Sequence, residues 1–142
     1  MRGWRTRAEE ETRQVGEALA AELAPDGALL LEGELGSGKT VLAQGVARGL
    51  GIDAREVASP TFTLVREHAG RGGARLVHVD LYRLEPAEAA ALGLEELLAG
   101  PGVKVVEWPE RLPWPVPGAR RLRLARGEGE GERVIAELAG ST

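Results

Sequence analysis

Eight consecutive residues, 33 to 40, match the phosphate-binding motif G-x-x-x-x-G-K-[ST] at every fixed position; in one-letter code they read GELGSGKT. An apolar run, residues 28–31, precedes the motif, and residues 41–47 have the pattern of a helix. Glycines allow backbone N–H groups to approach an anion closely, and a helix N-terminus adds partial positive charge. The segment therefore predicts a strand–loop–helix unit that binds the phosphates of a nucleotide.

The last two residues of the motif have separate expected roles. Lys39 is expected to reach the β- and γ-phosphates, and the Thr40 hydroxyl to ligate Mg²⁺. Lys39 and Lys104 are the only lysines among 18 basic residues. A chain that otherwise uses arginine has lysine where a compact phosphate-binding ammonium is needed.

Length and composition limit what such a chain can be. With 142 residues it is expected to form one domain, residues 1–142, with little room for a lid or a second substrate domain. The net charge of −4 argues against tight direct binding of nucleic acid, and the absence of cysteine excludes disulfides and thiol chemistry. The charged start lacks an apolar signal core and no segment is long enough to span a membrane, so the expected location is cytoplasmic.

Hydrophobic periodicity and turn residues predict alternating helices and strands. The expected helices cover residues 6–23, with a capping box from Thr6 to Glu9, then the segment from the phosphate loop to about residue 50, and residues 85–98. The expected strands are residues 28–32, 61–66, 74–82, 103–108, 120–126 and 133–138. Residues 70–73 are a hairpin-type turn. The prediction is an α/β P-loop fold with a mixed, mainly parallel central sheet, flanking helices and a C-terminal β-hairpin.

Two acids directly follow apolar strands, as hydrolysis of a bound nucleotide requires. Asp80 ends the run LVHVD, and Glu107 ends the run VKVVE. In P-loop folds the carboxyl ends of neighbouring strands lie beside the loop. Either acid could hold Mg²⁺ through water, with the other orienting the attacking water. Thr61 is a third candidate, because the proline-stiffened segment around it could present its hydroxyl to a γ-phosphate.

The histidines and one basic cluster receive structural interpretations. His78 is expected to pack or to form a hydrogen bond rather than to act as an acid or base, and His68, near a turn, is expected to be solvated. The basic cluster consists of Arg120, Arg121, Arg123 and Arg126. It is interpreted as the solvated face of an edge strand, with a docking patch for an acidic partner or RNA as the alternative.

Four segments in this order form a more specific pattern than the loop alone. They are GELGSGKT, SPTFTLV, HVDLYRL and EWPER, and together they resemble the TsaE family, also called YjeE, over nearly the whole chain. That family is a small bacterial P-loop ATPase required for making N6-threonylcarbamoyladenosine in tRNA. The resemblance implies that the chain binds ATP and Mg²⁺, assembles with the proteins TsaD and TsaB, meets tRNA only indirectly, and does not perform the threonylcarbamoyl transfer.

The resemblance also implies roles for individual residues. Thr40 and Glu107 become Mg²⁺ ligands, which resolves the choice between the two acids, and Asp80 becomes a residue needed for hydrolysis. Thr61 falls in a switch-like loop. The residues implied to contact the nucleotide are Leu35, Gly36, Ser37, Gly38, Lys39, Thr40, Trp108 and, in the EWPE element, Glu110. Val41 is a minor departure, since a second threonine is common at that position.

Three other classes share the phosphate loop. A small-molecule kinase is the main alternative, but it needs an acceptor pocket and an arginine-bearing lid, and the arginines here follow a strand pattern. A guanine-specific GTPase commonly uses an N-K-x-D element, and this chain has no asparagine. A binding module with a purely structural nucleotide would show no turnover.

Overall fold

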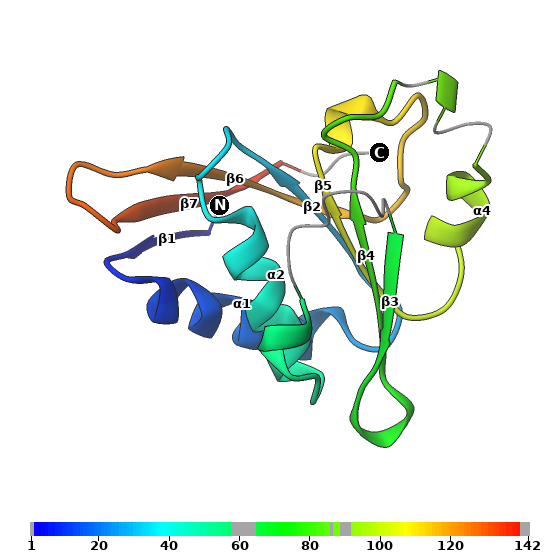
Figure 1. Cartoon of the computed structure of the whole chain (residues 1–142), viewed down its shortest axis with the longest axis horizontal. Coiled ribbons are helices and arrows are strands. Elements are labelled where there is room, and N and C mark those ends of the chain that lie inside the picture. The colour runs from blue at the N-terminus through cyan, green and yellow to red at the C-terminus, as the bar shows by residue number, and fades with distance from the viewer. Residues whose placement is uncertain (1, 58–64, 86, 89–91, 140–142) are drawn as a thin grey trace.

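A computed structural model describes residues 2–57, 65–85, 87–88 and 92–139. Its framework is a seven-stranded sheet in the order β1-β7-β6-β2-β5-β4-β3 (Figure 1). The strands are β1 Gly3–Thr6, β2 Ala28–Glu32, β3 Val65–Ala69, β4 Arg75–Asp80, β5 Val103–Glu107, β6 Arg120–Arg126 and β7 Arg133–Leu138. The helices are α1 Glu9–Leu23, α2 Lys39–Gly49 and α4 Leu94–Leu98, with 3₁₀ turns η1 Ala54–Glu56, η2 Arg71–Gly73 and η3 Pro109–Arg111.

The centre of the sheet is parallel and its margins are antiparallel. β2 pairs in parallel with β5 on one side and with β6 on the other, and β4 pairs in parallel with β5. The pairs β3–β4, β6–β7 and β1–β7 are antiparallel. Buried parallel strands need apolar residues on both faces, which the uninterrupted apolar run of β2 supplies. The predicted α/β fold with a mixed, mainly parallel sheet is confirmed.

Each face of the sheet has its own hydrophobic core. Leu29 and Leu31 of β2 face α1 and α2, which lie together on one side of the sheet in Figure 1. Ala28 and Leu30 face the opposite core, which contains α4 and the proline-rich segment before β6. The alternation along β2 thus fixes which residues face each layer, and it leaves the loop after Glu32 at the carboxyl edge of the sheet.

Helices α1 and α2 cross at very short distance. A Cβ atom on Gly16 would lie 2.4 Å from the carbonyl oxygen of Leu42, and one on Gly45 would lie 2.1 Å from that of Arg13. Only glycine permits this backbone approach at both positions. The glycines therefore allow α1 to pack directly on the helix that follows the phosphate loop.

Two expectations about helices are wrong. The capping box does not form, since α1 begins after Ala8, and the Thr6 hydroxyl instead shares a hydrogen bond of 2.7 Å with Thr12. The continuous helix over residues 85–98 is interrupted at Gly93, whose φ of +70° lies in the left-handed region, and α4 begins only at Leu94. Its expected first residue, Pro86, lies outside the described residues.

Two expectations about strands also need correction. β1 was not predicted, because four residues carry little periodicity and their partner lies at the other end of the chain. The arginine-rich β6 is not an edge strand, since it lies between β7 and β2. Three of its four arginines are held by carboxylates: Arg120 by Glu137, and Arg121 and Arg123 by Glu32. None of the helices in the described part of the chain is long and apolar enough to cross a membrane.

Candidate functional site

The loop between β2 and α2 has a backbone that glycine alone adopts readily. Gly36 and Gly38 have φ values of +79° and +104°, and Gly38 is the N-cap of α2. As a glycine, Gly38 has no side chain to cap that helix end, and the first N–H groups of such a helix start can bind an anion. Leu35 lies at the tip of the loop with 59% of its surface exposed. The side chain of Ser37 is buried, and its Oγ has no hydrogen-bond partner among the described residues.

Lys39 is buried at the start of α2 and points back over its own loop. Its ammonium group donates to the carbonyl oxygens of Gly33 and Glu34, and lies 3.8 Å from the centre of the Trp108 ring. Burial lowers the pKa of Lys39, while the negative charges of nearby carboxylates, Glu107 first among them, act to raise it. The backbone carbonyls thus hold a cation at the position where a phosphate is expected.

Thr40 and Glu107 meet across the sheet edge. The Thr40 hydroxyl is 3.2 Å from both carboxylate oxygens of Glu107. Glu107 is only 2% exposed, and its Oε2 also accepts a hydrogen bond of 2.6 Å from Nε2 of His78. A buried carboxylate needs such partners because desolvation is costly. His78 was expected to pack or to form a hydrogen bond, and it forms this one. The bond orients Glu107, the predicted metal ligand.

Asp80 lies next to Glu107, because the parallel register of β4 and β5 places the two residues opposite each other. It is 8% exposed, and its Oδ1 accepts a hydrogen bond of 3.0 Å from the backbone N–H of Tyr82. The two acids that ended separate apolar runs are thus brought together. Thr61, the third candidate, lies outside the described residues.

The segment after β5 covers the lysine. Trp108 has a left-handed backbone, with φ of +62°, which is uncommon for a large side chain. Its ring packs on Tyr82 with centroids 4.9 Å apart. Glu110 follows on η3, exposed to solvent, and its charge acts to raise the pKa of Lys39. Trp108 therefore lies beside the phosphate loop, and Glu110 is close enough for its charge to act on Lys39.

The donor set at this edge fits Mg²⁺. Mg²⁺ prefers oxygen ligands and usually keeps several waters and substrate phosphates around one or two protein ligands. A hydroxyl and a carboxylate within 3.2 Å of each other match that description. Within the described ranges, no group of three or more acidic, histidine or cysteine side chains forms a metal cage by itself. The residues present are therefore compatible with an Mg²⁺ site whose remaining ligands are waters or phosphate oxygens.

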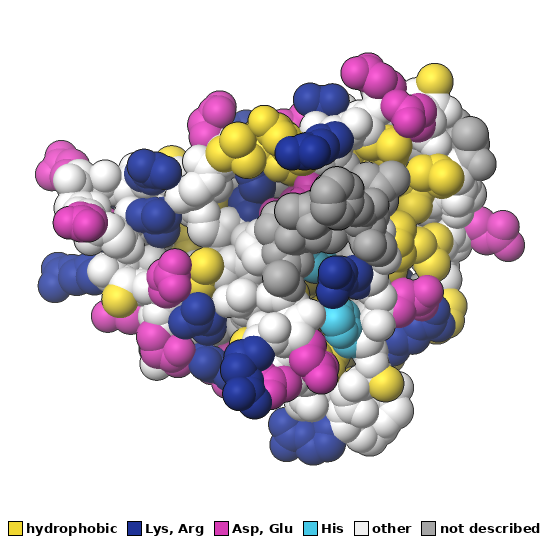
Figure 2. All heavy atoms as spheres, in the orientation of Figure 1, with side chains coloured by type: hydrophobic (Ala, Val, Ile, Leu, Met, Phe, Trp, Pro, Cys, Tyr) yellow, Lys and Arg dark blue, Asp and Glu magenta, His cyan; other side chains and the backbone are white. Residues whose placement is uncertain are grey.

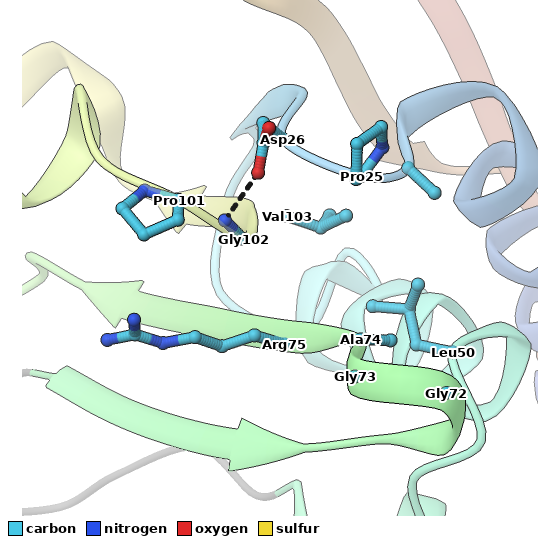
Figure 3. Close-up of a pocket in the computed structure, with 11 residues that line it drawn as sticks. Pro25, Asp26, Leu50, Gly72, Gly73, Ala74, Arg75, Pro101, Gly102 and Val103 are labelled. Atoms are coloured by element: carbon cyan, nitrogen blue, oxygen red, sulfur yellow. Dashed lines mark hydrogen bonds between the residues drawn. The ribbon is translucent and has the colours of Figure 1, made fainter.

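A hollow of about 350 Å³ lies away from the phosphate loop, near the start of β4 and β5. Figure 3 shows Asp26 and Gly102 on one side of it and Arg75 on another, with the Gly102 N–H donating to Asp26 at 2.8 Å. This contact ties the turn before β2 to the turn before β5. We assign the hollow no part in the site, because Lys39, Thr40 and Glu107 are absent from its lining.

The surface carries both signs of charge. On the face drawn in Figure 2, basic and acidic side chains are interspersed. His68 departs from the expected solvated state: its Nε2 atom is buried and has no partner in the described ranges, and burial lowers the pKa of His68.

Comparison with known proteins decides the family. Residues 6–135 match the family model described as "Threonylcarbamoyl adenosine biosynthesis protein TsaE". This chain belongs to the TsaE family. A TsaE-family protein of Bacillus subtilis, named as a tRNA threonylcarbamoyladenosine biosynthesis protein, is 42% identical over 93% of this chain and 82% of its own length. One of Treponema pallidum is 38% identical over 92% of this chain and 95% of its own.

A solved structure agrees with the family assignment. The crystal structure of Bacillus subtilis YdiB superposes with a TM-score of 0.72 at 36% identity, covering 96% of this chain and 83% of that one. The resemblance drawn from four short segments is therefore confirmed at the level of family and fold.

Sequence reasoning missed three features of this TsaE-family site. It gave no role to Tyr82, although an aromatic residue two positions beyond a strand-end acid was a usable signal. It placed Arg126 in a structural cluster, whereas the structure brings its guanidinium group against Gly36. It could not identify Glu107 as the partner of His78, because that contact depends on the register of β4 and β5.

Proposed function

We propose that this chain is an Mg²⁺-dependent ATPase that binds the TsaB–TsaD assembly and supports N6-threonylcarbamoyladenosine formation in tRNA in the cytoplasm. The observation that carries the proposal is the meeting of Lys39 and Thr40, on a glycine-rich helix start, with the buried carboxylate of Glu107. Family membership supports the role in tRNA modification. The transfer of the threonylcarbamoyl group itself is assigned to the partners.

The residues of the chain divide the work of binding and hydrolysis. The backbone N–H groups at the start of α2 and the ammonium of Lys39 bind phosphate oxygens and neutralise their charge. Lys39 exchanges its contacts with Gly33 and Glu34 for the phosphate when nucleotide binds. When present, Mg²⁺ supplies charge stabilisation at the transferring phosphate, and Thr40 and Glu107 are the residues that hold it. Asp80, at the neighbouring strand end, orients the attacking water, and Thr61 contributes from the switch-like segment.

Exposed side chains at this edge of the sheet support the expectation that partners bind here and accelerate hydrolysis. Leu35 and Tyr82 are exposed large apolar side chains beside the loop and beside Trp108. Other P-loop enzymes gain about 10³- to 10⁵-fold when a missing arginine is supplied by a partner. We therefore expect slow hydrolysis by the isolated chain and faster hydrolysis with TsaB–TsaD.

The test measures inorganic phosphate released from Mg²⁺-ATP by the wild-type chain and by Lys39→Ala, each with and without TsaB–TsaD. Phosphate release that depends on Lys39 and rises with the partners supports the proposal. A phosphorylated small molecule in place of free phosphate would establish the kinase alternative, and release that is unaffected by the partners would refute partner activation.

A second arm of the test concerns assembly. The tagged chain is mixed with TsaB–TsaD, with and without ATP, and captured. Recovery of both partners supports the proposed complex. Failure to recover either of them under both conditions would contradict it even if ATP is hydrolysed.

A further inference from the structure

The β6–β7 hairpin places two arginines against the phosphate loop. The Nη2 atom of Arg126 lies 2.3 Å from the point that a Cβ on Gly36 would occupy. The Cγ and Nε atoms of Arg133 lie 3.6 and 3.7 Å from the corresponding point on Gly38. Figure 1 shows the hairpin running beside the loop that joins β2 to α2. Both glycines belong to the motif, so both guanidinium groups lie next to where phosphates bind.

Arg126 of β6 and Arg133 of β7 differ from the other arginines of the hairpin strands. Arg120, Arg121 and Arg123 form ion pairs with Glu137 or Glu32. In the part of the chain that the structure describes, Arg126 and Arg133 form no ion pair, and Arg133 donates only to the backbone carbonyl of Glu132. The carboxylate of Glu132 is itself held by Arg5 and by the Gly129 N–H.

The two arginines also face each other in the sheet. Arg126 and Arg133 are directly paired residues of the antiparallel β6–β7 ladder. Like charges directly opposite each other destabilise a strand pair. The repulsion between these two unneutralised cations therefore destabilises the β6–β7 pair, and an electron-rich ligand bound between them would remove it.

The position of the hairpin indicates which part of a nucleotide it meets. Glu107 of β5 and Asp80 of β4, assigned to the metal and the γ-phosphate, lie on the β5 side of β2, and Thr40 of α2 contacts Glu107. β6 is the neighbour of β2 on the other side. A nucleotide with its γ-phosphate on the β5 side therefore has its opposite end on the β6 side.

We propose that Arg126 and Arg133 form the binding site for the nucleoside end of the nucleotide, its α-phosphate together with the ribose and base. This inference rests on the proposed nucleotide binding and adds the contacts that select the nucleoside end. Arginine suits both parts, because its planar guanidinium pairs with phosphate oxygens and stacks on aromatic faces.

The test is calorimetric titration of ADP and ATP into the wild-type chain, Arg126→Ala and the double variant Arg126→Ala/Arg133→Ala. Because the nucleoside end is common to both ligands, the single variant should bind ADP and ATP about 10- to 100-fold more weakly, by the same factor for each. Arg75→Ala, which removes an equally charged side chain at the amino end of β4, is the matched control and should bind as wild type does.

The outcomes separate this inference from its rivals. Unchanged ADP affinity with a reduced turnover rate would mean that Arg126 acts on the γ-phosphate, and would overturn the proposal. Unchanged affinity for both ligands would overturn it as well. If wild type binds neither nucleotide, the proposed function itself fails. Thermal unfolding without ligand provides the structural readout: Arg126→Ala should be as stable as wild type or more so, since it relieves the like-charge pair, and a less stable variant with normal affinity would indicate a role in the fold alone.

Discussion

Glu107 connects three chemical groups at one buried point. It accepts from His78, meets the hydroxyl of Thr40, and lies opposite Asp80 in the register of two parallel strands. Burying a carboxylate this deeply is costly without such partners, and a cation would add the strongest of them. The side chain is thus held ready in one orientation before any metal arrives.

Replacing Glu107 by Gln should separate metal use from nucleotide binding. The amide keeps the shape but loses the charge, so Mg²⁺-dependent phosphate release should fall by at least about 10-fold. Binding of ADP without Mg²⁺ should be little changed, because Lys39 and the loop backbone are intact. The measurement pairs a phosphate-release assay with titration of ADP in the presence and absence of Mg²⁺. Asp80→Asn is the comparison variant, expected to lower turnover while keeping the effect of Mg²⁺ on affinity; the reverse pattern would exchange the two roles.

The affinity for nucleotide should fall at alkaline pH. Burial lowers the pKa of Lys39 in the free chain, despite the opposing charge of Glu107, and bound phosphate would raise it again. Above the lowered pKa of the free chain, binding must take up a proton, so affinity decreases as pH rises and is constant below it. Titration of ATP without Mg²⁺ between about pH 7 and 10 tests this, with Lys39→Met as the control. A slope that persists in Lys39→Met would assign the effect to another group.

For individual residues, the sequence patterns predicted the residue types of the site and the strand ends that carry them, but not which strands pair. Lys39, Thr40 and Glu107 were singled out from the motif and from an acid after an apolar run, and the structure brings them together. The left-handed backbone of Trp108 and the tilted contact between its ring and that of Tyr82 depend on how β4 and β5 end side by side. Such contacts belong to tertiary structure, which local patterns do not encode.

Among the elements, the pair formed by α1 and α2 positions the phosphate loop. α2 begins at the motif lysine, and its orientation is fixed by packing on α1 through Gly16 and Gly45. Because the clashing atoms at both glycines belong to the backbone, no side-chain movement can relieve an added methyl group there. The start of α2, and with it the row of N–H groups proposed to bind phosphate, therefore depends on a contact farther along the helix.

Gly45→Ala should destabilise the chain by about 1–3 kcal/mol, the usual cost of overpacking, although alanine is the better helix former. The cause is the 2.1 Å approach to the carbonyl of Arg13. Urea unfolding followed by circular dichroism measures the change in the free energy of unfolding. Gly3→Ala is the matched control, since a Cβ at Gly3 meets its nearest atom at 3.4 Å. A Gly45→Ala variant as stable as wild type would show that the two helices can separate freely.

The elements that sequence predicted well are those with strong local patterns. β2, β5, β6 and β7 were placed within a residue or so, since their apolar or alternating runs are bounded by glycine and proline. β1 has four residues and only one neighbouring strand, β7, so its existence depends on a segment far along the chain. The break at Gly93 was missed because helical spacing of leucines continued across it.

Across the whole molecule, ion pairs between arginines and glutamates link the layers. Glu22 of α1 pairs with Arg120 of β6, which also pairs with Glu137 of β7. Glu32, at the end of β2, pairs with Arg121 and Arg123. The cluster that sequence assigned to a solvated edge thus joins a helix to the sheet and one strand to the next.

These pairs predict loss of stability in acid. Hydrogen bonds from Arg120 lower the pKa of Glu137 below its usual value of 4.5. Burial acts to raise the pKa of Glu32, but Arg121 and Arg123 outweigh it, so this pKa also lies below 4.5. Because the folded pKa lies below the unfolded one, the contribution is complete above about pH 4.5 and is lost as pH falls through the folded pKa. Urea unfolding at a series of pH values from 7 to 3 should show this decline. In Glu137→Gln the decline should be smaller, and an identical pH dependence would exclude Glu137 as a contributor.

The pairing of β1 with β7 has a consequence for how the chain acquires its structure. Among the described strands, β1 is hydrogen-bonded only to β7, and β7 in turn needs β6, which joins the sheet through β2. Contacts so far apart in sequence have a large loop-closure entropy and form slowly. On a ribosome, residues 3–6 would wait unpaired until residues 133–138 had been made. The sheet should therefore close in one late step that joins both ends of the chain, and removal of β7 would release β1 and leave β6 as a bare edge.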